Sequence, residues 1–106
     1  MNKYRNIKCE YDGLKFDSKL ERDRYIELKD NPNVRELQLQ VPFELIPKND
    51  LYRAVKYIAD FVYMSGDSKV VEDAKAVETK EFILKKKMFY DRYKIPIQLF
   101  KRRKTK

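Results

Sequence analysis

The sequence predicts a single α/β domain, and three patterns indicate it. Apolar and polar residues alternate in several short runs, two other stretches begin with a helix-capping residue, and one Asp-Gly pair separates two alternating runs. The predicted order is a β-hairpin followed by α, β, β, β, α and β, so that a mixed central sheet is flanked by two helices. The 106 residues suffice for one small domain. We assign residues 1–100 to it and residues 101–106 to a basic C-terminal tail.

The N-terminal elements are a hairpin and a helix. Asp12-Gly13 separates the two alternating runs of residues 7–16, which is a strong local signal for a β-hairpin. Ser18 and Glu21 have the spacing of a capping box, with Ser18 as the N-cap, so we expect a helix over residues 19–29. Glu21 falls inside the apolar arc of this helix rather than opposite it. That arc consists of Leu20, Tyr25 and Leu28.

The remaining predicted elements are three strands, a helix and a last strand. Pro42 lies within the first of these strands and indicates an edge strand or a bend. The second and third strands should form an antiparallel hairpin, and Thr79 can cap the second helix. The strands are expected over 34–46, 51–63, 69–75 and 95–100, and the helix over 80–93. The buried stripe of this helix is expected to contain Phe82, Phe89 and Tyr93.

The charge balance gives the first indication of a partner. Lys and Arg total 25 and Asp and Glu total 17, for a net charge of +8. The excess is uneven, because the segment from Lys85 to Lys106 contains ten basic residues and one acid, Asp91. A basic region on a small domain favours a polyanion, most often nucleic acid. The alternative is a solvated basic surface that serves solubility.

The composition also excludes several classes of site. The single Cys9 cannot form an internal disulfide, and without His the zinc sites that mix Cys and His cannot form. A bound metal would therefore be an oxygen-liganded ion such as Mg²⁺ or Mn²⁺. The segment after Met1 lacks an apolar signal region, and no apolar run approaches the ~20 residues of a membrane span. We therefore expect a cytoplasmic protein without membrane contact.

The acidic residues of the second and third strands suggest a metal site. Asp60 lies in an otherwise apolar strand, where an uncompensated carboxylate is costly to bury, and alternation would place it with Ile58 and Val62. Asp73 and Lys75 share a face of the next strand, about 7 Å apart along it. The spacing of 73 − 60 = 13 residues spans the predicted turn and brings the two carboxylates alongside each other. Such a pair favours a cation between them. The alternative is an outward-facing Asp60 and an exposed Asp–Lys ion pair.

These residues resemble the signature of the PD-(D/E)XK nuclease superfamily, namely Ser18-x-x-Glu21, Asp60 and Asp73-x-Lys75. That superfamily has a restriction-endonuclease-like αβββαβ core, whose first helix supplies a Glu and whose second and third strands supply an Asp and an Asp/Glu-x-Lys. Two further stretches, Asn31-Pro-Asn-Val34 and Gln40-Val-Pro-Phe43, are similar to a subgroup that contains phage junction-resolving endonucleases and a transposon-end nuclease subunit. The resemblance extends over most of the chain.

The resemblance implies a role for each site residue. Asp60 and Asp73 would be metal ligands, joined by the backbone carbonyl of Ala74. Lys75 would be the catalytic lysine, and Glu21 an accessory ligand or water-holding residue. The implied cofactor is Mg²⁺ or Mn²⁺, and the implied reaction is hydrolysis of a DNA phosphodiester bond.

The sequence departs from the superfamily pattern at two positions. Ala59 replaces the Pro of the motif, and Ala76 replaces the Gly that many relatives have after the motif Lys. Glu72 lies beside Asp73 and is the alternative ligand, although alternation favours Asp73 because it shares a face with Lys75. Gln40 is a further candidate, since similar Gln residues in relatives lie near the site; the alternative is an exposed strand amide.

Partners follow from the charge and from the resemblance. The resemblance implies branched DNA, such as a four-way junction, cut by a homodimer of phage or mobile-element origin in a bacterial cytoplasm. Lys86 is one of the residues that could contact DNA; alternatively, its side chain simply extends along the apolar stripe of the second helix and places its ammonium in solvent. A competing interpretation is a non-catalytic DNA-binding or accessory protein on a nuclease-like fold, and a third is a basic inhibitor or adaptor of another protein. The residues expected to contact the DNA backbone are Lys85, Lys86, Lys87, Lys101, Arg102 and Arg103.

Overall fold

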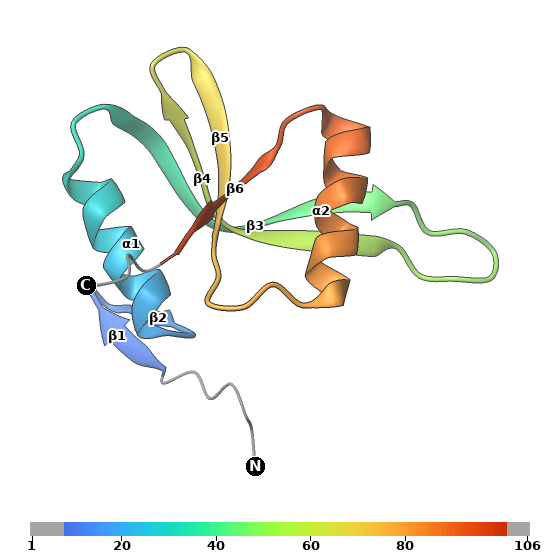
Figure 1. Ribbon diagram of the computed structural model, residues 1–106, viewed down its shortest axis with the longest axis horizontal. Coiled ribbons are helices and arrows are strands. Elements are labelled where there is room, and N and C mark those ends of the chain that lie inside the picture. Colours follow the sequence, from blue (N-terminus) through green and yellow to red (C-terminus); the bar gives the residue numbers. More distant parts are fainter. Residues whose placement is uncertain (1–7, 102–106) are drawn as a thin grey trace.

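The computed structural model describes residues 8–101, and the elements within them follow the predicted order (Figure 1). The strands are β1 (Cys9–Tyr11), β2 (Leu14–Phe16), β3 (Val34–Ile46), β4 (Val55–Ser65), β5 (Ser68–Ala74) and β6 (Ile97–Phe100), and the helices are α1 (Lys19–Asp30) and α2 (Lys80–Tyr93). The predicted α/β class is thereby confirmed. Ile7 and most of the predicted tail, including Arg102 and Arg103, lie outside the described residues.

The main sheet is mixed and has the order β3-β4-β5-β6. β3 pairs with β4 and β4 with β5 in antiparallel fashion, whereas β5 and β6 are parallel. β1 and β2 form a separate antiparallel hairpin. β3 is thus an edge strand, which accommodates Pro42 because an edge residue can lack a ladder donor.

Local chemistry sets the ends of these elements. Asp12 and Gly13 have φ values of 59° and 75°, the left-handed pair that a tight two-residue hairpin turn requires. The hydroxyl of Ser18 accepts a hydrogen bond from the Glu21 N–H at 3.1 Å, as predicted for an N-cap. The return bond of the capping box differs from the prediction, because the Glu21 carboxylate accepts from the Asp17 N–H at 3.2 Å.

Two predicted strands begin later than expected. The strand expected from residue 51 begins at Val55, because Asn49 closes a turn by accepting hydrogen bonds from the N–H groups of Leu51 and Tyr52 at 2.8 Å each. The strand expected from residue 95 begins at Ile97, after Pro96, which has no N–H to donate to a ladder. These differences leave the order of elements unchanged.

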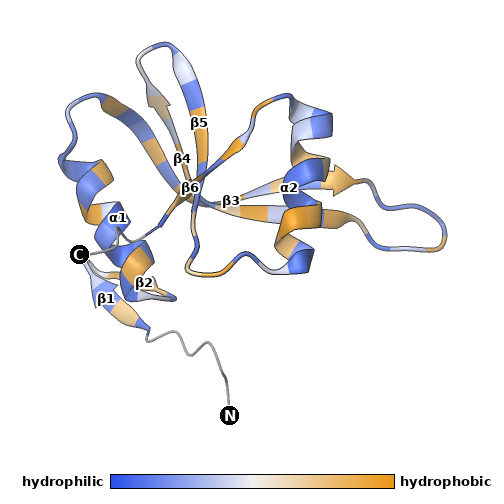
Figure 2. Cartoon of the chain, in the orientation of Figure 1, coloured by the Kyte–Doolittle hydropathy of each residue, from blue (hydrophilic) through white to orange (hydrophobic). Residues whose placement is uncertain are grey.

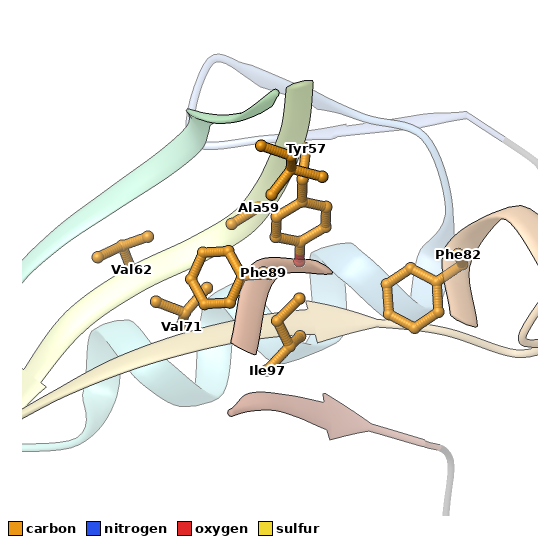
Figure 3. Packing of buried hydrophobic residues seen from close by; sticks show 8 residues of the cluster. Tyr57, Ala59, Val62, Val71, Phe82, Phe89 and Ile97 are labelled. Carbon is orange, nitrogen blue, oxygen red and sulfur yellow. The ribbon is translucent and has the colours of Figure 1, made fainter. Parts of the chain in front are cut away.

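Each helix covers its own hydrophobic cluster on the sheet. The cluster under α1 contains Phe16, Tyr25, Leu28, Phe61 and Tyr63. The cluster under α2 contains Leu45, Tyr57, Ala59, Val62, Val71, Phe82, Phe89 and Ile97, most of which Figure 3 shows converging on Phe89. Apolar and hydrophilic residues correspondingly alternate along the strands and around both helices (Figure 2). The predicted helix stripes are confirmed except at Tyr93, which is half-buried.

The alternation of β4 breaks at Asp60. Tyr57 and Ala59 pack in the α2 cluster, whereas Phe61, the next residue of the same parity, packs in the α1 cluster. Ile58 is exposed and lines the same groove as Asp60, whereas Val62 packs in the α2 cluster, so the predicted shared face of Ile58, Asp60 and Val62 is wrong at Val62. The break moves Asp60 out of the regular pleat.

Candidate active site

Asp60 and Asp73 lie where the ladder between β4 and β5 ends. The last paired residues are Phe61 and Glu72, and the same register places Asp60 opposite Asp73. At this point side chains replace the backbone rungs. The Asp60 N–H donates to Asp73 Oδ1 at 3.0 Å, and the Ala74 N–H donates to Asp60 Oδ2 at 3.0 Å. The predicted juxtaposition of the two carboxylates is therefore present, and it is held by reciprocal backbone hydrogen bonds.

Lys75 follows directly after β5, and its side chain reaches the Asp73 carboxylate. Its Nζ lies 3.2 Å from Asp73 Oδ2 and 4.6 Å from the centre of the Phe82 ring. Its backbone N–H donates to the Phe100 carbonyl at 3.1 Å, which fixes the chain at the end of the strand. Asp73 is buried, whereas Lys75 is partly exposed. The ammonium thus stands between a buried carboxylate and solvent, where a phosphate group can approach it.

Glu21 joins this cluster from α1 through Gln40 of β3. Gln40 Nε2 donates to Glu21 Oε2 at 2.8 Å and to Asp60 Oδ1 at 3.3 Å. The amide is oriented with its nitrogen toward both acids because ionised carboxylates only accept hydrogen bonds. The structure therefore brings together all four predicted site residues and Gln40.

The backbone of β3 is distorted at Gln40. Its φ is 53°, in the left-handed region that residues with a side chain rarely occupy. Gln40 lies opposite Asp60, since its neighbours Leu39 and Val41 pair with Phe61 and Ala59. Such a conformation costs on the order of 1 kcal/mol or more and persists where surrounding contacts enforce it, often at functional sites. The same irregular point in the sheet breaks the alternation of β4 and turns the Gln40 amide toward the acids.

Glu72 serves a different purpose on the opposite face of β5. Its carboxylate accepts from Arg24 Nε at 2.5 Å and Nη2 at 3.0 Å, and from the Tyr63 hydroxyl at 2.6 Å. Arg24 lies on α1 one turn after Glu21, so this buried ion pair fixes the helix that carries Glu21. The geometry separates Glu72 from Lys75 and leaves Asp73 as the acid of β5 within the cluster.

The cluster holds more negative charge than its surroundings favour. Burial, followed by the charges of Asp73 and Glu21, raises the pKa of Asp60 to about 7. Burial also raises the pKa of Glu21, with the charges of Asp17 and Asp73 acting in the same direction. Carboxylates with raised pKa values in a groove are a common feature of functional sites. A cation bound among them would relieve the repulsion.

The side chains of the cluster offer the atoms that a divalent cation prefers, but they are not arranged around a cation position. Carboxylate and amide oxygens are the donors that Mg²⁺ and Mn²⁺ prefer. Within residues 8–101, however, no three Asp, Glu or Cys side chains are arranged so that they can hold a metal ion. The Gln40 amide and the Lys75 ammonium now supply the positive partners of the acids. Cation binding therefore requires the Gln40 and Lys75 side chains to move away from the carboxylates.

The buried Tyr57 hydroxyl lies close to the same acidic cluster. Burial, followed by the charge of Asp73, raises the pKa of Tyr57 well above its usual range. The Asp73 carboxylate also acts on the hydroxyl as a nearby acceptor, but the contact is too poor to count as a regular hydrogen bond, and the hydroxyl has no other partner in the described part of the chain. An unpaired buried hydroxyl costs about 1–3 kcal/mol.

The cluster opens into a groove of about 360 Å³ between β4 and α2. Asp60, Asp73 and Glu81 are the acids that line it, and Lys75 lies beside Asp73. Two further lysines line it, Lys56 of β4 and Lys85 of α2. A phosphate backbone lying in this groove would meet ammonium groups at several points along the acidic cluster.

The predicted DNA-binding lysines are only partly brought together. Lys85 lines the groove and pairs with Glu81 at 3.3 Å. Lys86 and Lys101 both bind Glu78, at 2.8 and 3.1 Å. Lys87 instead lines a separate hollow beside Leu45. Arg102 and Arg103 stay predictions outside the described residues.

Three residues of the site environment were missed from the sequence. Lys56 and Tyr57 line the groove, and Arg24 fixes α1 through Glu72. Alternation on β4 would have placed Lys56 with Asp60, but an isolated exposed Lys carries little weight. Arg24 and Glu72 are 48 residues apart, and no local pattern links them.

The fold and the groove together define an α/β domain with an acidic, lysine-flanked cluster at the end of a strand ladder. The chain belongs to the family described as protein of unknown function (DUF1064), whose model matches residues 1–104. No curated protein matches the chain. Among residues 8–101, neither helix has the length and apolar character needed to cross a membrane.

Replacing Asp60 should stabilise the metal-free protein in a pH-dependent way. The pKa of Asp60 is about 7 in the native state against 3.8 as its usual value, so the native state binds this proton more tightly than the unfolded chain. The associated stability is fully present below about pH 4 and is lost as the pH rises through about 7. Asp60→Asn should therefore raise the free energy of unfolding by about 2–4 kcal/mol near pH 8, and the gain should vanish near pH 4. Urea unfolding in EDTA measures it, and a gain independent of pH would contradict the assignment.

Tyr57→Phe is expected to leave the free energy of unfolding unchanged or to raise it by up to about 1 kcal/mol. The ring packs against Phe89 with centroids 5.7 Å apart, and the substitution keeps this contact while removing an unpaired hydroxyl. Urea unfolding of the two proteins measures the difference. A loss above about 1 kcal/mol would show that the hydroxyl is hydrogen-bonded in solution.

Proposed function

We propose that the chain is a metal-dependent DNA endonuclease of the PD-(D/E)XK type, which hydrolyses phosphodiester bonds with Mg²⁺ or Mn²⁺. One observation carries the proposal. Asp60 and Asp73 replace the last rungs of the β4–β5 ladder with side-chain hydrogen bonds, and the Lys75 ammonium lies 3.2 Å from Asp73. Two acids are therefore held side by side by backbone hydrogen bonds, and a lysine ammonium lies beside one of them.

Each residue has a role in the proposed reaction. Asp60 and Asp73 would hold the metal, with the Ala74 carbonyl as a further ligand, and Glu21 would hold a water. When bound, the metal supplies an acidified water and neutralises charge on the phosphate. Lys75 would orient that water or bind a phosphate oxygen, and its charge would stabilise the transition state. Gln40 would keep Glu21 and Asp60 apart and aligned before DNA binds.

The groove supports DNA as the substrate. Lys56, Lys75 and Lys85 line it, and the chain carries a net charge of +8. Such contacts position a phosphate backbone without reading its sequence. The resemblance to junction-resolving enzymes supports branched DNA as the preferred substrate, a homodimer as the acting form, and a phage protein working in a bacterial cytoplasm. Sedimentation of the free protein and of its DNA complex tests the dimer.

Nicking of a supercoiled plasmid tests the proposed function. The unsubstituted protein should nick the plasmid in Mg²⁺ and not in EDTA, and Asp60→Asn and Asp73→Asn should not nick it. Both variants keep an oxygen that can accept the backbone hydrogen bond, so loss of the fold does not explain the result. Nicking that survives in both variants would refute the assignment.

A second candidate is a non-catalytic DNA-binding protein on the same fold. It is favoured by one observation, that the described residues contain no group of three acids already arranged to hold a metal. In that case the protein should bind DNA with equal affinity in EDTA and in Mg²⁺ and should cut none. Titration calorimetry with Mn²⁺ separates the two candidates, because only the nuclease needs a site that Asp73→Asn removes.

A further inference from the structure

The loop between β3 and β4, residues 47–54, projects beyond α2 at the end of the molecule away from α1 (Figure 1). Its tip presents Leu51 and Tyr52 to solvent, with exposures of 81% and 70%. Among residues 8–101 these are the two most exposed of the large hydrophobic side chains. Exposed apolar side chains at the tip of an extended arm suggest a contact made with a partner.

The tip has a defined backbone. The Asn49 carboxamide oxygen accepts hydrogen bonds from the N–H groups of Leu51 and Tyr52, and the Asn49 N–H donates to the Tyr52 carbonyl at 3.0 Å. These bonds close the loop around Asn49. The two side chains are therefore held outward by a closed turn and lose little backbone freedom when they bind.

The charge around the tip is complementary to phosphate. Lys48, Arg53 and Lys56 are all exposed, and Asp50 is the one acid between residues 47 and 56. Two apolar side chains are also too few for the roughly 1,000 Å² that a stable protein interface buries. Aromatic side chains flanked by cations are instead typical of surfaces on which unpaired bases stack.

The arm is continuous with the proposed active site. Lys56 lines the same groove as Asp60 and Asp73. It precedes Asp60 by four residues of β4, about 13 Å at the rise of an extended strand. A DNA backbone that follows the groove away from Asp60 therefore leads to the tip.

We infer that this arm is a branch-recognising element: Leu51 and Tyr52 stack on or insert between unpaired bases, while Lys48, Arg53 and Lys56 hold the flanking phosphates. The inference rests on the proposed function in one respect, that the groove binds DNA. It narrows the branched DNA of that proposal to branches that carry unpaired bases a short distance from the cut. Side chains that wedge between bases unstack them, which is easiest where pairing is already interrupted.

Binding measured in EDTA tests the inference without requiring cleavage. The probes are a three-way DNA junction with 2-aminopurine at an unpaired base of the branch, and a continuous duplex of the same length. Leu51→Ser combined with Tyr52→Ser should lower affinity for the junction by roughly 10-fold or more and abolish the fluorescence change, while affinity for the duplex changes less than about twofold. Arg53→Gln should weaken binding to both the junction and the duplex. It should also reduce by about 1 the slope of the logarithm of affinity against the logarithm of salt concentration.

Tyr90→Ser is the matched control, because Tyr90 is an exposed tyrosine of α2, at 52%. It should bind both DNAs as the unsubstituted protein does. Equal losses on junction and duplex in the double variant, or no loss on either, would overturn the inference. A change in sedimentation with unaltered DNA binding would also overturn it and identify a protein contact. Failure of the proposed function would give a different result: the protein would still prefer the junction in the binding assay but would not cleave DNA in Mg²⁺.

Discussion

Lys75→Ala is expected to lower Mg²⁺-dependent DNA cleavage by about 10²–10³-fold or more. The ammonium is the cation closest to the acidic cluster, 3.2 Å from Asp73 Oδ2, and its charge would stabilise the transition state in a partly buried site. DNA affinity should change little, because Lys75 is one of several lysines along the groove. Single-turnover cleavage and equilibrium binding measure the two effects separately.

The control for this variant is Lys15→Ala. Lys15 is an exposed residue of β2, in the N-terminal hairpin and outside the groove. It removes the same charge and should leave the cleavage rate within about twofold. Cleavage by Lys75→Ala at the rate of Lys15→Ala would show that this lysine has no part in the reaction.

Glu72→Ala is expected to lower the free energy of unfolding by about 3 kcal/mol. The carboxylate is buried, and its removal leaves the Arg24 guanidinium and the Tyr63 hydroxyl without their shared acceptor. Breaking a buried ion pair costs about 3–5 kcal/mol, and the partial exposure of Arg24 places the loss at the lower end. Urea unfolding at neutral pH measures it.

Glu27 provides a matched comparison, since it pairs with the same arginine at 3.0 Å but is 56% exposed. Glu27→Ala should cost less than about 0.5 kcal/mol, as exposed helix pairs do. Equal losses in the two variants would show that the Arg24–Glu72 pair does not anchor α1. If the pair does anchor α1, Glu72→Ala should also loosen the position of Glu21.

Much of the fold follows from local chemistry that is visible in the sequence. Asp12-Gly13 supplies the left-handed turn of the hairpin, and Ser18 and Thr79 cap the two helices, each accepting from a backbone N–H at 3.1 Å. The 13-residue spacing also places Asp60 opposite Asp73, because the turn between β4 and β5 sets the register. These signals lie within a few residues of their effects or within one hairpin.

The rest depends on contacts between distant segments. The break in alternation at Asp60 accompanies a left-handed φ at Gln40 on the neighbouring strand. The sequence does not predict this φ, because a glycine would indicate a left-handed residue and Gln40 does not. The separation of Glu72 from the acidic cluster is fixed by Arg24, 48 residues away. The unpaired hydroxyl of Tyr57 likewise becomes visible only once the strands and α2 are packed.

Cleavage of three DNA substrates tests the central claim most directly. A four-way junction, a linear duplex and a single strand are incubated with Mg²⁺ and either the unsubstituted protein or Asp73→Ala. We predict cleavage of the junction above the other two, and no cleavage by the variant. Absence of cleavage on every substrate, combined with tight binding that does not depend on metal, would contradict the nuclease assignment and leave the DNA-binding candidate.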